Sequence, residues 1–408
     1  MSDAVLPALT VSSEPIDDPG PLLHLTEPGS PLSFVRRGAG LIGIGEALRL
    51  EFRGPTRLRD AAAAWRDLTE RASTRDEVGE RGSGLVAFGA FCFADASPAA
   101  SVLIVPSMLV GRRRGRSWVT RVDTDAPLPR PSPWGSPLFC EFSPRGLDGR
   151  GYEAAVRRAL DAITDGTVAK VVLARELAGR LPAAPDLRRV LDWLALAYPD
   201  TWTYAVDGAL GSSPETLVAV SEGVARARVL AGSIRRGEDE LSDAELAAAL
   251  STSVKDLDEH GYAVRSLLAA LRPFSPSATA SEAPFALKLP NLWHLASDIA
   301  GPVAPGVSSL DLLAALHPTA AVAGTPRAAA LQLIAELEPD DRGRYAGPVG
   351  WVDASGDGEW AIALRGAQVH PDGTVVAHAG AGIVAESVPE RELAETTLKF
   401  QPVLEAFS

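Results

Sequence analysis

The stretch 356–400 near the C-terminus constrains the fold more than any other part of this sequence. An apolar run ends on Arg365, a second run covers 374–379, and the sequence Pro-Asp-Gly at 371–373 separates them. Two apolar runs joined by such a turn predict two β-strands in a hairpin. A glycine-rich segment at 379–384 follows, and then a helical pattern. The sequence therefore predicts one hairpin-plus-helix unit.

This hairpin-plus-helix unit concentrates groups that bind ions. The Arg365 guanidinium ends the first strand, and the glycines expose the backbone N–H groups of residues 380–382. The helix carries two carboxylates and an ammonium, from Glu392, Glu395 and Lys399. Such a set suits a small, doubly charged carboxylic acid that is held beside a divalent cation.

Composition excludes several classes of protein. The 408 residues, 46% of them hydrophobic, suffice for one large or two ordinary domains with a sizeable core. The net charge of -13 argues against a nucleic-acid binder. No apolar run is long enough for a membrane span, and the acidic start does not resemble a secretory signal. Cys92 and Cys140 make neither a disulfide framework nor a zinc site, which favours a reducing cytoplasm.

The order of patterns along the chain favours a mixed α and β protein. Residues 1–30 are acidic and rich in proline and serine, and we expect a mobile tail. Residues 31–145 are expected to be a β-rich half, with strands at 33–36, 40–44, 47–52, 85–93, 101–110 and 117–122 and a helix at 60–72. In the region 146–406 we predict helices at 151–164, 186–198, 243–250 and 253–271, strands between them, and a turn at 211–215.

Two conspicuous motifs are interpreted as ordinary turns. The segment 38–43 matches the G-x-G-x-x-G pattern of dinucleotide-binding proteins, but no helix opens on its last glycine. A β-turn is the simpler interpretation. The basic run 112–116 joins two predicted strands, and such a hairpin tip in an acidic protein is expected to be solvated.

Two pairs of carboxylates share one spacing. Asp256 and Glu259 lie three residues apart on the predicted helix 253–271, as do Glu392 and Glu395 on the last helix. Like charges at this spacing cost about 0.3 kcal/mol. Two interpretations stay open: solvated helix faces relieved by lysines four residues away, or one cleft where four carboxylates hold Mg²⁺. The sequence Ser-Val-Pro-Glu at 387–390 matches a capping box at the start of the last helix.

Taken together, these stretches resemble the chorismate-utilising enzymes, most closely the isochorismate synthases. That family also includes salicylate synthases, anthranilate synthase large subunits and aminodeoxychorismate synthases. The resemblance is dense from about 151 to 403, less specific at 34–51, and rests on the segments 170–175, 211–217, 230–237, 255–260, 292–295, 316–319, 324–326, 347–351, 358–365 and 379–399. It implies an α/β (α+β) fold, a single domain of two large, mostly antiparallel β-sheets packed together, with helices outside.

The resemblance also implies a Mg²⁺ site. Glu259 and Glu395 would bind the metal directly, and Asp256 and Glu392 would act through metal-bound waters. Relatives often have glutamate where this chain has Asp256, and the shorter side chain suits an outer-shell role. Lys399 would neutralise charge beside the metal.

Further residues are implied to hold the substrate. Arg365 and the backbone around the glycines would bind the enolpyruvyl carboxylate, and other residues would line the ring or make further contacts. The implied set is Arg365, Gly380, Ala381, Gly382, Gly232, Ser233, His294, Thr325 and Tyr345. Without the resemblance, Arg365 alone would be interpreted as a strand-end ion pair and His294 as a core histidine.

Lys170 and Glu215 indicate the reaction. On residues alone, a lysine that snorkels from a strand and a glutamate in a turn after Pro214 are open alternatives. A lysine at this position resembles the family members that use water as nucleophile, and Glu215 resembles their general acid. A lysine can act as a base only if its pKa falls from about 10.4. The implied reaction is the Mg²⁺-dependent isomerisation of chorismate to isochorismate, with water added at C2 and the hydroxyl lost from C4.

Other activities and partners are less favoured. Salicylate synthase, which also eliminates pyruvate, is the main alternative, followed by an anthranilate synthase large subunit or a non-catalytic chorismate-binding protein. Ala231 stands where aminodeoxychorismate synthases have a lysine nucleophile, and the L-L-E-S motif of tryptophan sensing is not evident. We therefore expect a monomeric, cytoplasmic enzyme without a glutamine amidotransferase subunit, serving menaquinone or siderophore biosynthesis.

Overall fold

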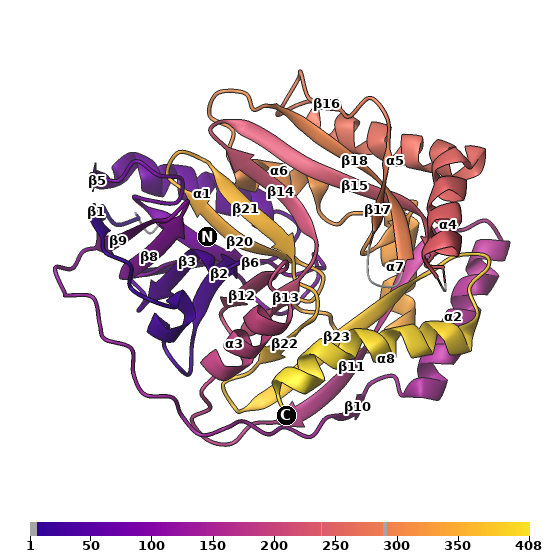
Figure 1. Ribbon diagram of the computed structural model, residues 1–408, viewed down its shortest axis with the longest axis horizontal. Helices are drawn as coiled ribbons and strands as arrows, with labels where there is room; N and C mark the ends of the chain where they lie inside the picture. Colours follow the sequence, from indigo (N-terminus) through magenta and orange to yellow (C-terminus); the bar gives the residue numbers. More distant parts are fainter. Residues whose placement is uncertain (1–5, 238, 289–291) are drawn as a thin grey trace. The chain divides into compact units, whose positions relative to one another are not determined.

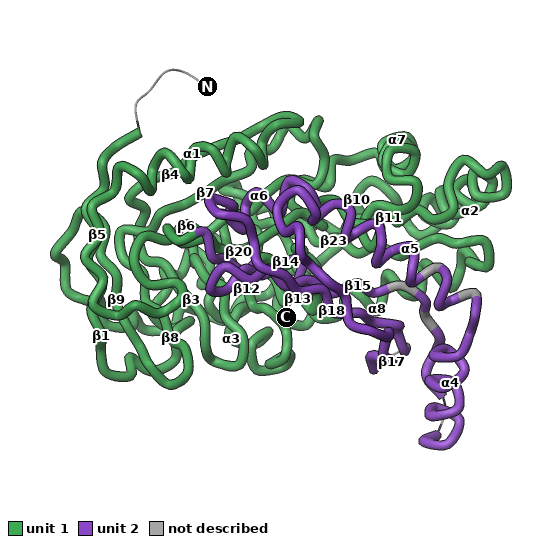
Figure 2. The backbone as a smooth tube through the Cα atoms, turned by 90° about the horizontal axis from the view of Figure 1, so that it is seen from above, with its two compact units in different colours: residues 1–215, 317–355, 360–408 green, residues 216–316, 356–359 purple. Residues whose placement is uncertain are grey.

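The computed structural model describes residues 6–237, 239–288 and 292–408, apart from the side chains of Ala231, Ser233, Lys255, Glu259 and Leu292. The chain forms two compact units (Figure 2). Unit 1 comprises residues 1–215, 317–355 and 360–408, and unit 2 comprises residues 216–316 and 356–359. Among the helices so described, none is both long and apolar enough to cross a membrane.

Unit 1 contains a sheet of thirteen strands. In spatial order these are β10 (Ser143–Arg145), β11 (Lys170–Arg180), β23 (Thr374–Ile383), β22 (Gly366–Val369), β13 (Ala209–Ser213), β12 (Trp202–Val206), β2 (Leu32–Arg36), β3 (Ala39–Ile44), β8 (Met108–Arg113), β9 (Arg116–Val122), β1 (Thr10–Ile16) and β5 (Ser73–Asp76), with β19 (Gly324–Thr325) beside β11. Neighbouring strands are antiparallel except β1 and β5, which are parallel.

A second sheet has ten strands. Its run in unit 1 is β20 (Pro348–Asp353), β6 (Val86–Ala90), β7 (Ser101–Val105) and β4 (Leu48–Phe52), all antiparallel. Its strands in unit 2 are β16 (Thr279–Ala280), β17 (Phe285–Lys288), β18 (Leu292–Pro302), β15 (Val224–Arg235) and β14 (Thr216–Ser221). The chain passes from unit 2 to unit 1 within β21 (Gly358–Ile362).

Aromatic side chains between the two sheets form one core of unit 1. Phe34 of β2 stacks on Trp202 of β12 with ring centroids 4.5 Å apart. Both pack in one buried cluster with Phe88 of β6, Trp118 of β9 and Trp351 of β20. Burial of each such side chain stabilises the fold by about 1.5–3 kcal/mol. Two large, mostly antiparallel sheets packed face to face confirm the predicted fold class.

Helices cover the opposite face of the larger sheet. Because side chains alternate along a strand, Val375, Ala377 and Ala379 of β23 face a second core, formed with α3 (Arg188–Ala197) and α8 (Pro389–Ala406). In Figure 1, α8 lies along β23, and α2 (Gly149–Thr164) packs beside α8. The remaining helices are α1 (Arg57–Arg71), α7 (Arg327–Leu337) and the 3-10 helix Leu22–Leu25 in unit 1, and α4 (Glu240–Thr252), α5 (Val254–Leu271) and α6 (Ser309–Leu316) in unit 2.

The structure corrects the expectation of a mobile tail for residues 6–30, and residues 1–5 lie outside the described residues. Strand β1 pairs with β9 on one side and with β5 on the other. Val11 is buried within it, and the 3-10 helix buries Leu22 and Leu23. The composition, rich in proline and serine, suggested a segment exposed to solvent. Strand pairing instead satisfies the backbone hydrogen-bonding groups and removes these apolar side chains from water.

The structure corrects two further boundaries. Residues 211–213 of the expected turn at 211–215 instead belong to strand β13, which pairs with β12. The tight turn lies at Asp207 and Gly208, whose φ angles are +51° and +76°. The expected strand 101–110 is two strands, β7 and β8. The segment 38–43 behaves as predicted: Arg37 and Gly38, both with positive φ, form the turn between β2 and β3.

Candidate active site

The pairing of β11 with β23 positions Lys170. Lys170 begins β11, half-buried, and its register partner in β19 is Thr325, another predicted site residue. A Cβ atom added to Gly382 of β23 would lie 3.1 Å from Cε and 3.7 Å from Nζ of Lys170. The lysine side chain therefore lies over Gly382, and the missing Cβ gives it room. Lys170, Thr325 and Gly382 are brought together as predicted.

The glycine segment is a strand, which revises the expected row of exposed N–H groups. Gly380, Ala381 and Gly382 pair with Ala174, Leu173 and Val172 of β11. The N–H of Ala174 donates to Glu338 at 2.8 Å and that of Val172 to Ala323 at 2.9 Å, both away from β23. Because hydrogen bonding alternates along an antiparallel pair, Gly380 and Gly382 direct their N–H groups away from β11, whereas Ala381 faces it.

Tyr345 lies over the same glycines. Its hydroxyl oxygen would be 3.2 Å from a Cβ on Gly380, and its ring stacks on His378 with centroids 4.9 Å apart. Burial raises the pKa of Tyr345 to about 12, against the positive charges of Arg342 and Arg365. The phenol therefore stays neutral and able to donate a hydrogen bond at physiological pH.

Arg365 lies in the turn after β21 rather than at the end of the strand. The strand ends at Ile362, and Arg365 has a φ of +49°, a left-handed conformation that a non-glycine residue adopts only at a cost. Its carbonyl accepts a hydrogen bond from the Ser212 N–H at 3.1 Å. Burial lowers the pKa of Arg365, and Tyr345, Glu395 and Glu215 are close enough to oppose this. This strained position is consistent with a functional role.

Glu215 follows β13 and is the last residue before the chain enters unit 2. Its backbone is held by Ser213, whose Oγ accepts the Glu215 N–H at 3.2 Å, and by the Ile362 N–H, which donates to the Glu215 carbonyl at 3.0 Å. Burial raises the pKa of the Glu215 carboxyl, and the charges of Lys170, Lys399 and Arg365 oppose the rise. Glu215 thus lies within electrostatic range of three predicted site residues and has the raised pKa expected of a general acid.

Helix α8 brings its charged residues to the same strand. Lys399 Nζ donates to the Gly380 carbonyl at 2.8 Å and pairs with Glu395 at 2.6 Å. Burial raises the pKa of Glu392, Ser387 lowers it through a hydrogen bond, and the charge of Glu395 raises it again. The expected capping box is wrong, because α8 begins at Pro389 with Val388 as its N-cap and without a side-chain cap. Pro389 in the first turn is as predicted.

Unit 2 brings three other predicted residues together. Gly232 has a φ of +79° at an irregularity in β15 between Leu230 and Ser233. A Cβ there would lie 3.3 Å from Cβ of Asp256 on α5, and His294 Nδ1 lies 3.4 Å from the Gly232 carbonyl, to which it donates. The side chains of Ser233 and Glu259 lie outside the described residues. Within the part of the chain that is described, no cluster of three or more His, Cys, Asp or Glu side chains has metal-binding geometry.

Sequence reasoning missed two residues of unit 1. Tyr152 of α2 is buried, donates to the Leu173 carbonyl at 3.2 Å, and has its pKa raised by burial and by the nearby Glu392. His378 stacks on Tyr345. Its only sequence signal is its place two residues before Gly380, on the same face of β23.

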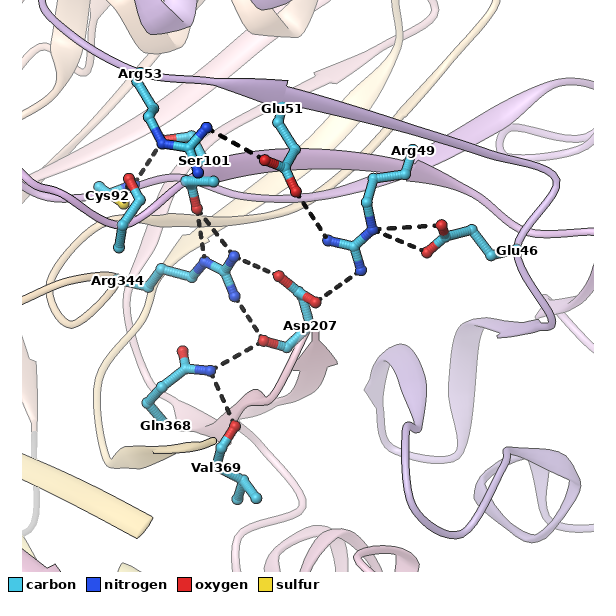
Figure 3. A network of polar contacts seen from close by, with 12 residues as sticks. Glu46, Arg49, Glu51, Arg53, Cys92, Ser101, Asp207, Arg344, Gln368 and Val369 are labelled. Carbon is cyan, nitrogen blue, oxygen red and sulfur yellow. Dashed lines mark hydrogen bonds and ion pairs between the residues drawn. The ribbon is translucent and has the colours of Figure 1, made fainter. Parts of the chain in front are cut away.

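Two arginines flank Tyr345. Arg342 forms a buried pair with Glu338 at 2.6 Å and donates to the carbonyls of Val322 and Val172. Arg344 pairs with Asp207 (Figure 3). It also donates to the Ala100 carbonyl at 2.9 Å. The residues on both sides of Tyr345 are thereby attached to four other segments of unit 1, at Val172, Val322, Asp207 and Ala100.

Comparison with known proteins gives the family. The family model "Chorismate binding enzyme" matches residues 140–408. The chain is 40% identical over 267 residues to isochorismate synthase DhbC of Bacillus subtilis, covering 62% of this chain and 67% of the relative. It is 39% identical over 344 residues to MenF of Mycobacterium tuberculosis, covering 80% and 87%.

Solved structures show the same fold. The crystal structure of DhbC from Bacillus anthracis is 32% identical, with a TM-score of 0.75, over 95% of this chain and 99% of that one. MenF from Escherichia coli, 23% identical, has a TM-score of 0.78 over 100% and 96%. The clustering of Lys170, Glu215, Arg365 and the β23 glycines thus occurs in a chain that belongs to the family of chorismate-binding enzymes.

Proposed function

We propose that this protein is an isochorismate synthase, which converts chorismate to isochorismate. The observation that carries the proposal is the proximity, in unit 1, of a lysine and a glutamate with a raised pKa. Lys170 lies over Gly382, and its charge acts on Glu215 together with those of Lys399 and Arg365. A base and an acid at one site are what exchange of a hydroxyl between two ring carbons requires.

In the proposed reaction, Lys170 removes a proton from a water molecule while the water oxygen forms a bond to C2 of the ring. The ring double bonds shift, the C4–O bond breaks, and Glu215 donates its proton to the departing hydroxyl, which leaves as water. One water enters and one leaves, so the reaction is an isomerisation. Proton exchange with solvent returns both side chains to their starting states.

The remaining residues of unit 1 would bind the substrate. The Arg365 guanidinium and the N–H groups of Gly380 and Gly382 would hold one carboxylate, and the neutral Tyr345 hydroxyl would donate a further hydrogen bond. Lys399 would place positive charge at the same strand, through its bond to the Gly380 carbonyl. His294, Gly232 and Ser233 are assigned to the ring by family resemblance alone.

The reaction is proposed to need Mg²⁺. On α8 the carboxylates Glu392 and Glu395 lie three residues apart. Burial and the negative charge of Glu395 raise the pKa of Glu392, and carboxylate oxygens are the donors that Mg²⁺ prefers. The chemistry of these two donors suits the metal. By family resemblance alone, Glu395 and Glu259 would bind it, and Asp256 and Glu392 would act through its waters. When bound, it would supply positive charge that balances the carboxylates of the substrate.

Product analysis tests this function. The protein is incubated with chorismate, with and without Mg²⁺, and the products are separated by chromatography. Isochorismate should form with Mg²⁺ and fall to background after EDTA treatment. Salicylate with pyruvate would identify a salicylate synthase, and a product that requires ammonia would indicate an anthranilate synthase. Chorismate binding without turnover would make the chain a binding protein. The monomeric state, the absence of an amidotransferase subunit and the cytoplasmic location stay predictions.

A further inference from the structure

A buried histidine–glutamate pair lies beside the proposed substrate-binding face. Glu176 of β11 and His378 of β23 are register partners, and His378 Nε2 donates to Glu176 Oε1 at 3.0 Å. Both side chains are more than nine-tenths buried, with exposed fractions of 8% and 9%. Neither residue has a part in the proposed proton transfers.

Charged groups surround the buried pair and make its loss costly. Glu176 Oε2 is buried and, in the described structure, makes no hydrogen bond; Arg145 Nε of β10 lies 3.5 Å away. The charged groups that line the same small cavity are Arg145, Arg175, Glu338, Asp340 and Arg342. Burying a carboxylate is costly unless it is paired, so removal of His378 would leave Glu176 with Arg145 as its nearest partner.

The pair holds an aromatic ring against Tyr345. The rings of His378 and Tyr345 are 4.9 Å apart and nearly parallel, with an interplanar angle of 9°. A histidine whose Nε2 is bonded to a buried carboxylate cannot rotate freely, so its ring offers a fixed surface. The main chain around Tyr345 is already attached through Arg342 and Arg344. His378 supplies the contact that fixes the side chain itself.

The contact with His378 positions the hydroxyl of Tyr345. It lies near Gly380, whose N–H faces away from β11 and toward the proposed carboxylate site. Along one face of β11 and β23 the order is therefore Lys170 with Gly382, then Gly380 with Tyr345, then His378 with Glu176.

We propose that His378, held by Glu176, is a positioning residue that fixes the Tyr345 hydroxyl above Gly380 for hydrogen bonding to the substrate. This inference deepens the proposed function and rests on it. His378 touches no reacting atom and acts through Tyr345.

A double-mutant cycle tests the proposal. Tyr345→Phe removes one hydrogen bond to a charged substrate group and should raise KM for chorismate about tenfold with little change in kcat. His378→Ala should raise KM by a similar factor. The double variant should be no worse than Tyr345→Phe alone, since His378 acts only through the missing hydroxyl. His378→Phe keeps a ring to stack on but loses the bond to Glu176, and should recover only part of the affinity. Independent losses that multiply in the double variant would overturn the proposal.

A readout without substrate separates this proposal from the proposed function. The chain has only five tyrosines, so ¹³C-labelled tyrosine gives a simple NMR spectrum in which Tyr345→Phe assigns the Tyr345 signal. The Tyr345 ring should flip slowly in the wild type, faster in His378→Ala and at an intermediate rate in His378→Phe, which keeps the stacking but not the bond to Glu176. His370→Ala, an exposed histidine at the turn before β23, should change nothing. An unchanged flip rate in His378→Ala would refute the positioning role, whereas an inactive wild type would refute only the proposed function.

Discussion

Glu215 shows how surroundings prepare one carboxyl group for proton transfer. Burial raises its pKa above the ordinary 4.5, and three cations limit the rise. The group therefore binds its proton to a higher pH than a solvated glutamate does, as a general acid must. The opposing cations, above all Lys170, are also the groups that the proposed reaction uses.

Replacing either proposed proton-transfer residue should abolish turnover without unfolding the protein. Lys170→Ala and Glu215→Gln should each lower kcat by about 10²–10⁴-fold, because each removes the group that accepts or donates a proton. Steady-state kinetics with chorismate measures this. Glu390→Gln makes the same charge change at an exposed position on α8 and should leave kcat unaltered. Wild-type kcat in both site variants would contradict the assigned roles.

The substitution Glu215→Gln should also change how the stability of the protein depends on pH. A raised folded-state pKa means that the stability contributed by protonated Glu215 is complete below 4.5 and is lost as the pH rises through the folded-state value. Glutamine never ionises, so Glu215→Gln should gain stability relative to the wild type between pH 5 and pH 8. Urea unfolding at the two pH values provides the comparison.

At the scale of elements, the ladder of β11 and β23 determines the proposed site. Three alternate residues of β23, His378, Gly380 and Gly382, face the side that carries Lys170 and Tyr345, and the residues between them face α8. A shift of one residue in this register would exchange the two faces. The glycines are needed because Lys170 and Tyr345 occupy the space where their side chains would be.

Gly382→Ala should therefore damage catalysis more than folding. The new Cβ would be 3.1 Å from Cε of Lys170, so the flexible lysine must move while the backbone can stay. We expect kcat to fall at least tenfold. Tm should change by only about 2 °C, because the flexible lysine side chain can move to relieve the close contact. Gly29→Ala, at a position with open space around it, is the matched control. Unchanged kcat in Gly382→Ala would show that Lys170 is not confined there.

A carboxylate at the tip of the β12–β13 hairpin bonds residues beside the site. Asp207 at its tip bonds Arg49 at 2.8 Å and pairs with Arg344, next to Tyr345 (Figure 3). Burial acts to raise the pKa of Asp207, but the hydrogen bonds and charges of Arg49 and Arg344 outweigh it and lower the pKa below 3.8.

A lowered pKa predicts the pH range in which this attachment stabilises the fold. The contribution of Asp207 is present above the unfolded value of 3.8 and is lost as the pH falls through the lower folded value. Asp207→Asn should thus lower the free energy of unfolding at pH 6, and the difference from the wild type should shrink below pH 3.8. Urea titrations across this range measure it. A difference that does not depend on pH would mean that packing, not charge, is responsible.

At the scale of the whole molecule, the family model matches only residues 140–408, but the core of unit 1 also contains side chains from before residue 140. Strand β12 pairs with β2 and β20 pairs with β6, so each sheet joins a block of strands from before residue 140 to a block from after it. Phe34, Phe88 and Trp118 supply much of the aromatic core.

A fragment of residues 140–408 should consequently fail to fold cooperatively. Loss of three buried aromatic side chains alone removes about 5–9 kcal/mol, comparable with the entire stability of a typical domain. Circular dichroism on heating should show no sharp transition for the fragment, in contrast to the full chain. A cooperative transition at the full-length Tm would mean that residues 1–139 are dispensable for folding.

The sequence by itself predicted the helix over 253–271 and the turn within 38–43 and, through family resemblance, the fold class and the residues of the candidate site. These depend on local chemistry: apolar periodicity, glycine at positive φ, and motifs that keep residues such as Lys170 and Glu215 at set positions. Only the tertiary structure decided that the tail holds strand β1, that the glycine segment pairs with β11, and that His378 and Tyr152 join the site. Those features depend on which distant strand pairs with a given segment and satisfies its backbone N–H groups. That pairing is decided by how much apolar surface the whole sheet buries.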